Sequence, residues 1–597
     1  MFQDRLHAQL LPALQHAFKD LFGHELAPDA IAFQSTRPEF EGDVTINVFP
    51  FLKISGKGPE QTASAIGEYL QQHVPIVKRT NVVKGFLNIL IADSYWIGFL
   101  NEAARRDLLS FPSTGRKVMV EYASPNTNKP LHLGHLRNIF LGHSVSRILE
   151  TAGNEVIKAQ IINDRGIHIC KSMVAWIEFG DCETPESGDM KGDKLVGKYY
   201  VEFDRQYRRE VEELIGQGVQ KEQAEKEAPL MLQAQEMLRK WEANDPEVRA
   251  LWQKMNGWVY DGFQATYDRI GAEFDRVYYE SETYILGKND ILKGLEKGVF
   301  YQKEDGSVWV DLTADGLDQK VLLRSDGTSV YMTQDVGTAI KRFEEFPGLS
   351  RLIYTVGNEQ DYHFKVLFLI LKKLGFEWAD GLHHLSYGMV DLPSGKMKSR
   401  EGTVVDADDL MEEVVSEARR TSEELGKLEE FTPEQRNAIF EMIGMAALKY
   451  YLLKVDAKKR MLFDPAASID INGHTGPFIQ YTHARIRSLL RKAGSVDRGE
   501  MRGSPATELI AEEKAVIVLL HRYPLVLSEA ARDLDPSALA NHAYEVVKAY
   551  NAMYQNLPVL KEMDPMKREL RLSLSAVVAD TTRKAMWCLG MDVPDRM

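Results

Sequence analysis

Two histidines, His132 and His135, flank Gly134 in the stretch SPNTNKPLHLGHLRN, residues 124–138. The apolar run KVMVEYA before them is typical of a buried strand, and LRNIFLGHSVSRILE after them is typical of a helix. The histidines are therefore expected at a strand-to-helix turn, where free N–H groups and the helix dipole favour phosphate. Imidazole donors there could bind phosphate oxygens as negative charge builds up, and Gly134 would let a base or phosphate approach the backbone.

Other interpretations of the histidine pair remain open on these residues alone. A zinc site would want a third ligand and usually histidines four apart on a helix. Histidines that are hydrogen-bonded within a core are also common. The short H-x-G-H pattern by itself does not separate these possibilities.

A second cluster of charged residues follows about 260 residues later in SGKMKSREGTVV, residues 394–405, which carries Lys396, Lys398 and Arg400. Cations on a glycine-rich loop suit a clamp that closes over a triphosphate. A solvated basic turn is the alternative. The two motifs together indicate nucleotide binding more specifically than either does alone, because both fall where the ligand crevice of a doubly wound sheet is expected.

The elements that would position these residues alternate between strand and helix from Lys117 onward, which predicts a parallel sheet with right-handed crossovers. Charged helical sequence replaces this alternation in about 191–272 and is interpreted as an insertion. Strand-like runs nearly vanish after residue 405. The predicted fold is α/β: a small α+β N-terminal module (1–112), a doubly wound, Rossmann-like parallel-sheet domain (113–405) with that helical insertion, and an all-α C-terminal domain (406–597).

Composition limits the classes of function. The formal net charge of −14 argues against indiscriminate nucleic-acid binding but leaves room for a local basic face. No apolar run approaches the roughly 20 residues of a membrane span, and the first residues suggest an amphipathic helix rather than a signal peptide. The three cysteines are too scattered for a disulfide framework or a four-thiolate zinc site. We expect a cytoplasmic protein.

The two motifs resemble the "HIGH" and "KMSKS" signatures of class I aminoacyl-tRNA synthetases, and within that class the chain resembles the arginyl-tRNA synthetases. The resemblance spans nearly the whole length and includes the N-terminal segments EGDVTINV and GFLNI. Its other supporting segments are VEYASPNTNKPLHLGHLRN, YMTQDVGTA, GNEQDYHF, GKMKSREGTVV, GPFIQYTHARI and MDVPDRM.

The resemblance implies that ATP activates arginine to arginyl-adenylate and that the arginyl group passes to the 3′-terminal ribose of its tRNA. His132 and His135 would stabilise the phosphates, Gly134 would lie under the adenine, and Lys396 would steady the leaving pyrophosphate. The implied ATP site also includes Met397, Lys398, Ser399 and Arg400.

The lysine motif departs from the general class signature. Lys398 stands where serine is usual, and Ser399 stands where the second lysine is usual. The family often lacks that second lysine and places a lysine just before the H-x-G-H motif, where this chain has Lys129. How Lys129, Lys398 and Arg400 divide this work stays open.

Selecting arginine requires carboxylates and carbonyls that match a guanidinium. By resemblance, Glu121 would meet the α-ammonium and Asp335 the guanidinium. A structural pair with a core arginine or tyrosine is the alternative for Glu121, and a helix cap is the alternative for Asp335. The other residues implied at this pocket are Ser124, Asn126, Tyr331 and Gln360.

The segment TGPFIQYTHARIRSLLRKAG combines aromatic residues with cations, which suits unstacked bases of single-stranded RNA. A merely solvated amphipathic helix is the alternative. The resemblance implies that the all-α domain reads the anticodon, that the N-terminal module touches the outer corner of the tRNA, and that the chain is a monomer. The expected tRNA-binding residues are Gln480, Tyr481, Arg485 and Arg487.

No tightly bound cofactor and no dedicated metal site are expected, and Mg²⁺ should accompany ATP as substrate. Two rival functions are a nucleotidyltransferase acting on a small metabolite and a catalytically silent RNA-binding relative. The first would usually be shorter and lack the C-terminal helices, and intact His132, His135 and Lys396 speak against the second.

Overall fold

The computed structural model describes residues 5–37, 39–106, 110–391, 405–424, 431–494 and 508–597. Most of the lysine motif therefore lies outside the described residues, including Lys396, Met397, Lys398, Ser399 and Arg400.

The N-terminal module is the small α+β unit that the sequence predicts. Its elements are α1 (Arg5–Phe22), β1 (Phe33–Ser35), β2 (Val44–Asn47), α2 (Leu52–Ser55), α3 (Pro59–His73), β3 (Val77–Val83), β4 (Phe86–Ile91) and α4 (Asp93–Arg105). The strands form an antiparallel sheet of order β1-β2-β4-β3. In α1 the buried residues Leu6, Leu10, Leu14 and Phe18 recur every four positions, so one face of the helix packs into the core of the module.

A parallel five-stranded sheet forms the centre of the chain and confirms the predicted doubly wound fold. Its strands are β5 (Lys117–Glu121), β6 (Glu155–Ile162), β7 (Arg276–Tyr279), β11 (Leu349–Gly357) and β12 (Leu382–Tyr387). Their order is β12-β11-β5-β6-β7, and every neighbouring pair is parallel. The chain winds one way from β5 to β7 and the other way to β11 and β12. The strand order thus reverses between β5 and β11, which is where such sheets bind ligands.

Helix α5 (Leu133–Thr151) connects β5 to β6 and is buried on almost every side. It is enclosed because it contacts β6 and β11 of the sheet as well as the C-terminal helices. The helix lies close to the segment that follows β5: a Cβ atom on Gly142 would fall 2.3 Å from Cβ of Tyr122. Glycine is therefore required at this crossing.

Helices fill the long connection from β6 to β7. They are α6 (Ile167–Phe179), α7 (Gly192–Gly216), α8 (Lys221–Glu227), α9 (Pro229–Glu242) and α10 (Pro246–Ile270). Helix α10 ends at Gly271, whose φ of 67° is left-handed, and the chain turns there towards β7.

The connection from β7 to β11 contains a small antiparallel sheet that the sequence analysis did not predict. The sheet consists of β8 (Tyr301–Gln302), β9 (Val308–Val310) and β10 (Lys320–Leu323). The helices of this connection are α11 (Glu280–Thr283), α12 (Lys288–Glu296) and α13 (Tyr331–Glu345). Strands of two to four residues are too short to show an alternating pattern in the sequence. Helix α14 (Asp361–Lys373) then joins β11 to β12.

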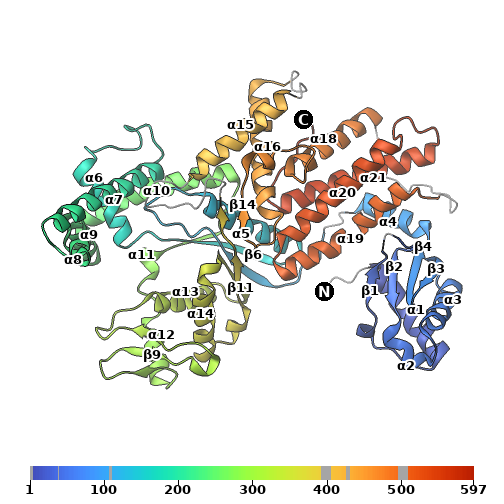
Figure 1. Cartoon of the computed structure of the whole chain (residues 1–597), viewed down its shortest axis with the longest axis horizontal. Helices are drawn as coiled ribbons and strands as arrows, with labels where there is room; N and C mark the ends of the chain where they lie inside the picture. The colour runs from blue at the N-terminus through green and yellow to red at the C-terminus, as the bar shows by residue number, and fades with distance from the viewer. Residues whose placement is uncertain (1–4, 38, 107–109, 392–404, 425–430, 495–507) are drawn as a thin grey trace.

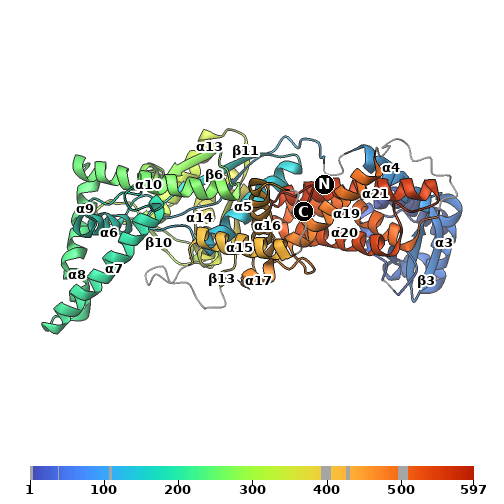
Figure 2. The same cartoon turned by 90° about the horizontal axis from the view of Figure 1, so that it is seen from above.

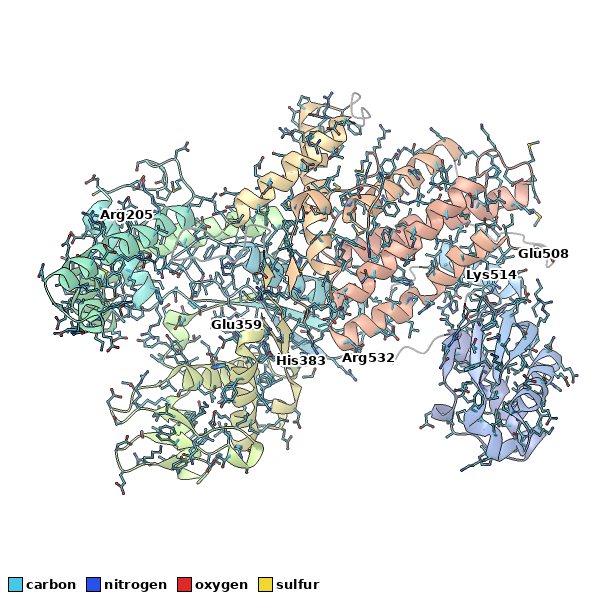
Figure 3. All side chains as sticks on the ribbon, in the orientation of Figure 1. Arg205, Glu359, His383, Glu508, Lys514 and Arg532 are labelled. Atoms are coloured by element: carbon cyan, nitrogen blue, oxygen red, sulfur yellow. The ribbon has the colours of Figure 1, made fainter. Side chains whose placement is uncertain are left out.

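The described C-terminal residues are helical, as predicted, apart from one two-stranded pairing of β13 (Val390–Asp391) with β14 (Met461–Leu462). The helices are α15 (Ala407–Glu424), α16 (Pro433–Leu453), α17 (Pro465–Ser468), α18 (Gly476–Ala493), α19 (Ala511–Asp533), α20 (Pro536–Asn556) and α21 (Pro565–Cys588). Lys514 of α19 donates to Asp43 at 2.9 Å, so this domain is tied to the N-terminal module (Figure 3).

The molecule is elongated. The N-terminal module lies at one end, helices α7 to α9 lie at the other, and the parallel sheet and C-terminal helices lie between them (Figures 1 and 2). Among the described helices, none is both long and apolar enough to cross a membrane.

Candidate active site

The two histidines lie at the turn from β5 into α5, where the sequence places them. His132 is the N-cap residue of α5. Its Nδ1 atom accepts the backbone N–H of Gly134 at 3.2 Å, and Nδ1 of His135 accepts the backbone N–H of His132 at 3.1 Å. The ring centroids are 3.9 Å apart. Each imidazole therefore uses Nδ1 to satisfy a free N–H group at the helix start.

This bonding fixes the tautomer of both rings. A neutral imidazole that accepts through Nδ1 carries its proton on Nε2 and can donate from there. Burial, together with the positive charge of Lys129, lowers the pKa of His132 to about 3. Burial also lowers the pKa of His135 well below its usual value, with contributions from His132 and Lys129. Both side chains are thus neutral Nε2–H donors at physiological pH.

Gly134 has a local reason to be glycine that the sequence analysis did not identify. A Cβ atom there would lie 3.1 Å from Cε1 and 3.2 Å from Nδ1 of His132. Contacts this short would press the imidazole away from the backbone N–H that it accepts. The glycine therefore allows His132 to fold back over the first turn of α5.

Asn138, one turn after His135, connects the two strands on either side of the reversal in strand order. Its Oδ1 atom accepts the N–H of Ala123 at 2.7 Å, and its Nδ2 atom donates to the carbonyl of Thr355 at 2.6 Å. Ala123 directly follows Tyr122 after β5 and has a φ of 59°. The sequence analysis missed Asn138, although its spacing from His135 places both residues on one face of the helix.

Lys129 is half-buried just before the histidines. Burial lowers the pKa of its ammonium group. It lines a cavity of about 480 Å³ together with His132, Asp406 and residues of α7. Lys396 is outside the described residues, so the proximity of Lys396 to the two histidines stays a prediction.

Glu121 lies at the end of β5 and is 5% exposed. It forms an ion pair with the guanidinium of Arg342, which is 1% exposed, so the structural pair with a core arginine is present. The pKa of Glu121 is raised above its usual value, mainly by burial. The charge of Arg342 opposes this increase, and the charge of Asp335 adds to it. Asp335 is therefore close enough for its charge to act on Glu121.

Asp335 lies within α13 and does not cap it, because the helix begins four residues earlier at Tyr331. Its Oδ2 atom lies 2.6 Å from Nε2 of His363 on α14. Tyr331, one helical turn before Asp335, is 75% exposed. The carboxylate and the phenol ring thus lie on one face of α13 beside the end of the sheet.

Glu280 is a third acid of this region and was missed by the sequence analysis. It begins α11 directly after β7, at the same edge of the sheet. Burial, Asp164 and Asp335 raise its pKa to about 7, and Arg165 opposes the increase. No local pattern marks Glu280, because the neighbouring Asp335 is 55 residues away in the sequence.

The remaining residues expected around arginine lie at the same edge of the sheet. Asn126 is exposed and pairs with Asn163 in an isolated bridge beyond the ends of β5 and β6. The carbonyl of Ser124 accepts from the Asn163 side chain at 3.3 Å. Gln360 is exposed in the turn between β11 and α14.

On α18, the expected RNA-binding residues divide between surface and core. Arg485 stacks over Tyr481 at 4.8 Å and donates to Asn551 at 2.9 Å, and Arg487 pairs with Asp595 at 3.1 Å. Gln480 is fully buried and donates to the carbonyl groups of Met442 and Asp592. Its placement suits anchoring of the C-terminal residues and does not suit direct contact with RNA.

Three family comparisons cover most of the chain. The family described as "tRNA synthetases class I (R), catalytic domain" matches residues 105–464. The "DALR anticodon binding domain" matches residues 479–597, and the "Arginyl tRNA synthetase N terminal domain" matches residues 8–91.

Similar proteins extend over the full length. An arginine--tRNA ligase of Bacteroides thetaiotaomicron is 55% identical over 597 residues, covering 99% of this chain and 100% of that one. One of Flavobacterium psychrophilum is 54% identical, covering 98% and 99%. The solved arginyl-tRNA synthetase of Thermus thermophilus matches with a TM-score of 0.77 at 25% identity, covering 99% and 100%. The chain therefore belongs to the arginyl-tRNA synthetases, the class I aminoacyl-tRNA synthetases that act as arginine--tRNA ligases.

Proposed function

We propose that His132 and His135 bind the phosphates of ATP through Nε2 while arginine is activated. The observation that carries this proposal is the bonding of both Nδ1 atoms to backbone N–H groups, which leaves each Nε2–H as a donor. The donors lie at the start of a helix beside the reversal in strand order, where phosphate is favoured. Since the rings are neutral, they act as oriented dipoles rather than as charges.

In the proposed reaction, an oxygen of the arginine carboxylate attacks the α-phosphorus of ATP and the bond to the bridging oxygen breaks. Pyrophosphate leaves with the bonding electrons. Negative charge on the phosphate oxygens increases at the transition state, and the two Nε2–H donors are already in place to meet it. By resemblance, Lys396 steadies the pyrophosphate, and Lys129 takes part of the work of the missing second lysine.

We propose that the guanidinium of arginine meets a wall of Asp335 and Glu280, with Tyr331 and Gln360 at its rim. The charge of Asp335 raises the pKa of Glu280, so a permanent cation between the two carboxylates would relieve their repulsion. Lysine and citrulline should be rejected by about 10⁴ or more, because they would leave hydrogen-bond acceptors of the pocket unpaired. Ser124, Asn126 and the Glu121 carboxylate would hold the α-amino end of the substrate.

On the RNA side, we propose that Tyr481, Arg485 and Arg487 contact the anticodon loop, with Gln480 supporting them from the core. An arginine stacked on a tyrosine offers a base both a cation and an aromatic face. The contact of the N-terminal module with the outer corner of the tRNA rests on the resemblance. The division of the chain after residues 112 and 405, and a monomeric cytoplasmic state, stay predictions.

Magnesium would enter with ATP and neutralise charge on its phosphates. Asp406, which forms a bridge with His132, and its neighbours Asp408 and Asp409 already contact Lys191 and Lys194. In the described part of the chain, no cluster of three histidine, cysteine or acidic side chains could hold a metal ion. We propose that the ion binds as part of the Mg-ATP substrate.

Exchange of labelled pyrophosphate into ATP tests the proposal. The full-length enzyme is incubated with Mg-ATP and each amino acid in turn, with and without tRNA. We expect exchange with arginine alone and, by family resemblance, only when tRNA is present. Exchange with another amino acid would reassign the pocket, and exchange that survives His135→Ala unchanged would contradict the role of the imidazoles.

A further inference from the structure

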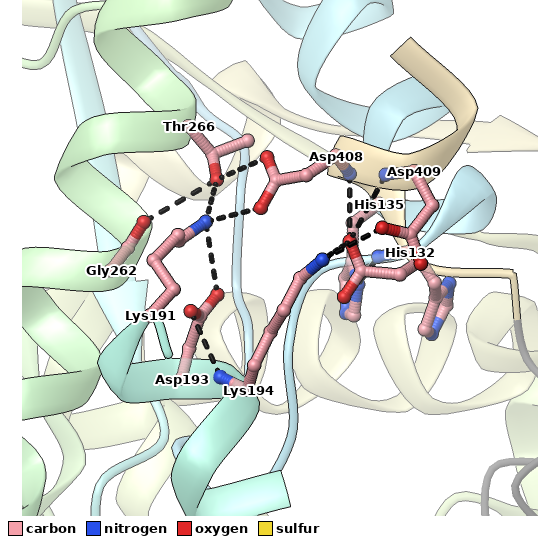
Figure 4. A network of polar contacts seen from close by, with 10 residues as sticks. His132, His135, Lys191, Asp193, Lys194, Gly262, Thr266, Asp408 and Asp409 are labelled. Atoms are coloured by element: carbon pink, nitrogen blue, oxygen red, sulfur yellow. Dashed lines mark hydrogen bonds and ion pairs between the residues drawn. The ribbon is translucent and has the colours of Figure 1, made fainter. Parts of the chain in front are cut away.

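A cluster of lysines and acids joins α7 of the insertion to the first turn of α15, directly beside the histidines (Figure 4). Lys191 contacts Asp408 at 2.5 Å and also donates to Thr266 of α10 at 2.6 Å. Lys194 contacts Asp409 at 2.8 Å. Three helices that are far apart in the sequence thus meet in one set of polar contacts.

The start of α15 is bonded to the backbone that carries the catalytic motif. The Ala407 N–H donates to the carbonyl of Leu131 at 2.9 Å, and His132 and Asp406 form an antiparallel bridge. The Asp406 side chain accepts the N–H of Asp408 at 2.8 Å and lies 3.5 Å from Lys194. Any shift of this first turn would therefore move the backbone of residues 131–132.

Helix α7 also packs directly on the segment before the histidines. A Cβ atom on Gly197 would fall 2.7 Å from Cδ of Pro130. On the neighbouring turn, Asp193 is fully buried against Gly262 of α10. A Cβ atom on Gly262 would fall 2.5 Å from Oδ1 of Asp193. These close approaches leave α7 little room to move relative to the motif.

The carboxylates in this cluster outnumber the lysines that hold them together. Four carboxylates, those of Asp193, Asp406, Asp408 and Asp409, share Lys191 and Lys194. Burial, with the charges of Asp408 and Asp406, raises the pKa of Asp193 to about 6 against the opposing effect of Lys191. If a lysine lost its charge, repulsion among the acids would push the first turn of α15 away from α7.

We propose that Lys191 and Lys194 are positioning residues for adenylate formation. By holding the start of α15 against α7, they keep the backbone of residues 131–132 in place and so aim Nε2 of His132 at the phosphates. This inference rests on the proposed role of the histidines. The loss of exchange in His135→Ala tests that role separately, so the failure of one proposal can be told from the failure of the other.

Lys191→Met and Lys194→Met, made in the full-length enzyme, test the inference by pyrophosphate exchange. We expect kcat to fall about tenfold to a hundredfold, because small misplacements of a catalytic group have effects of this size. The KM for arginine and the Kd for tRNA should stay within about twofold, since neither ligand touches the cluster in the proposed site. Lys191→Arg and Lys194→Arg keep the charge and should retain most of the activity.

The matched control is Arg208→Met, which removes a cation from the same helix. Arg208 pairs with Asp204 within α7 at 2.8 Å and lies outside the cluster. This variant should keep the wild-type kcat. An equal loss in Arg208→Met would show that general weakening of α7, rather than the cluster, causes the effect.

Charge rescue separates positioning from bulk stability. Adding Asp408→Asn to Lys191→Met, or Asp409→Asn to Lys194→Met, removes the unbalanced carboxylate and should recover much of the lost kcat. Asp409 is 71% exposed in its side chain, so the second pair probes the cluster even if Lys191→Met does not fold. Wild-type kcat in both single variants, or a loss that neither acid substitution reduces, would overturn the inference.

Discussion

Nε2 of His363 lies 2.6 Å from Oδ2 of Asp335, so the acid proposed to select arginine already has an imidazole partner. The two residues come from neighbouring helices, α13 and α14, and their side chains are 43% and 29% exposed. A carboxylate has two oxygens and accepts more than one donor, so His363 can hold the carboxylate in one orientation while a guanidinium approaches.

Removing the Asp335 carboxylate should therefore reduce the use of arginine. For Asp335→Asn we expect kcat/KM for arginine to fall roughly 30- to 4,000-fold, which corresponds to a loss of about 2–5 kcal/mol in transition-state binding. The preference for arginine over lysine and citrulline should shrink with it. His363→Ala should cause a smaller loss, because it only frees the carboxylate to rotate. If Asp335→Asn lowers the thermal midpoint and leaves specificity intact, the guanidinium role is wrong.

Two substitutions of His135 separate its two hydrogen bonds. Asparagine keeps an acceptor near the position of Nδ1 and loses the outer donor, whereas glutamine places an amide donor near the position of Nε2. We expect His135→Asn to lower adenylate formation by about two orders of magnitude, as His135→Ala should, and His135→Gln to retain more activity. Filter binding should show nearly unchanged tRNA affinity in all three. Equal activity of the asparagine and glutamine variants would exclude donation through Nε2.

At saturating arginine, the pH profile of kcat should lack a histidine inflection near 6.5, because burial lowers the pKa of His132 to about 3 and that of His135 well below its usual value. Unfolded histidine gains a proton near pH 6.5 while the folded rings stay neutral, so these residues reduce stability as the pH falls below 6.5. His132→Asn should make that acid dependence less steep. NMR of the imidazoles would show the titration directly, and a ring that titrates near 6.5 would contradict the neutral-donor mechanism.

The parts of the site that lie close together in the sequence could be predicted from it. The strand, turn and helix around His132 and His135 follow from apolar patterns within about 30 residues, and the parallel sheet follows from their repetition. The pairing of Glu121 with Arg342 could not be selected from the alternatives, because more than 200 residues separate them and only the sheet and α13 bring them together.

Gln480 shows a different limit of sequence reasoning. The composition of α18 suited either an RNA-binding helix or a merely solvated one, and it did not show which face of the helix is buried. Ile479, His483 and Ile486 recur at helical spacing and are buried, and Gln480 lies next to that stripe. A helical projection of these residues would have separated it from Tyr481 and Arg485.

Arginine binding should depend on the protonation of Glu280. Burial together with Asp164 and Asp335 raises the pKa of its carboxyl to about 7 in the free enzyme, and a guanidinium binds the ionised form. Below pH 7 the carboxyl must lose a proton before arginine can bind, so the Kd should rise roughly tenfold between pH 8 and pH 6. Calorimetric titration with arginine measures this change. Glu280→Gln should bind more weakly at pH 8 and show little pH dependence, and an unchanged pH dependence in that variant would assign the titration to another group.

The buried pair of Glu121 and Arg342 allows a structural role to be separated from a substrate role. Arg342→Met leaves an unpaired buried carboxylate and should destabilise the enzyme by about 3–5 kcal/mol, and Glu121→Gln leaves an unpaired guanidinium with a similar cost. The double variant removes both charges, so its free energy of unfolding should recover most of the loss.

If Glu121 also binds the α-ammonium of arginine, the KM for arginine stays raised in the double variant, because the substrate still lacks its partner. Denaturant unfolding and pyrophosphate exchange on the same four proteins decide the question: recovery of stability with a wild-type KM would show that Glu121 serves only the fold.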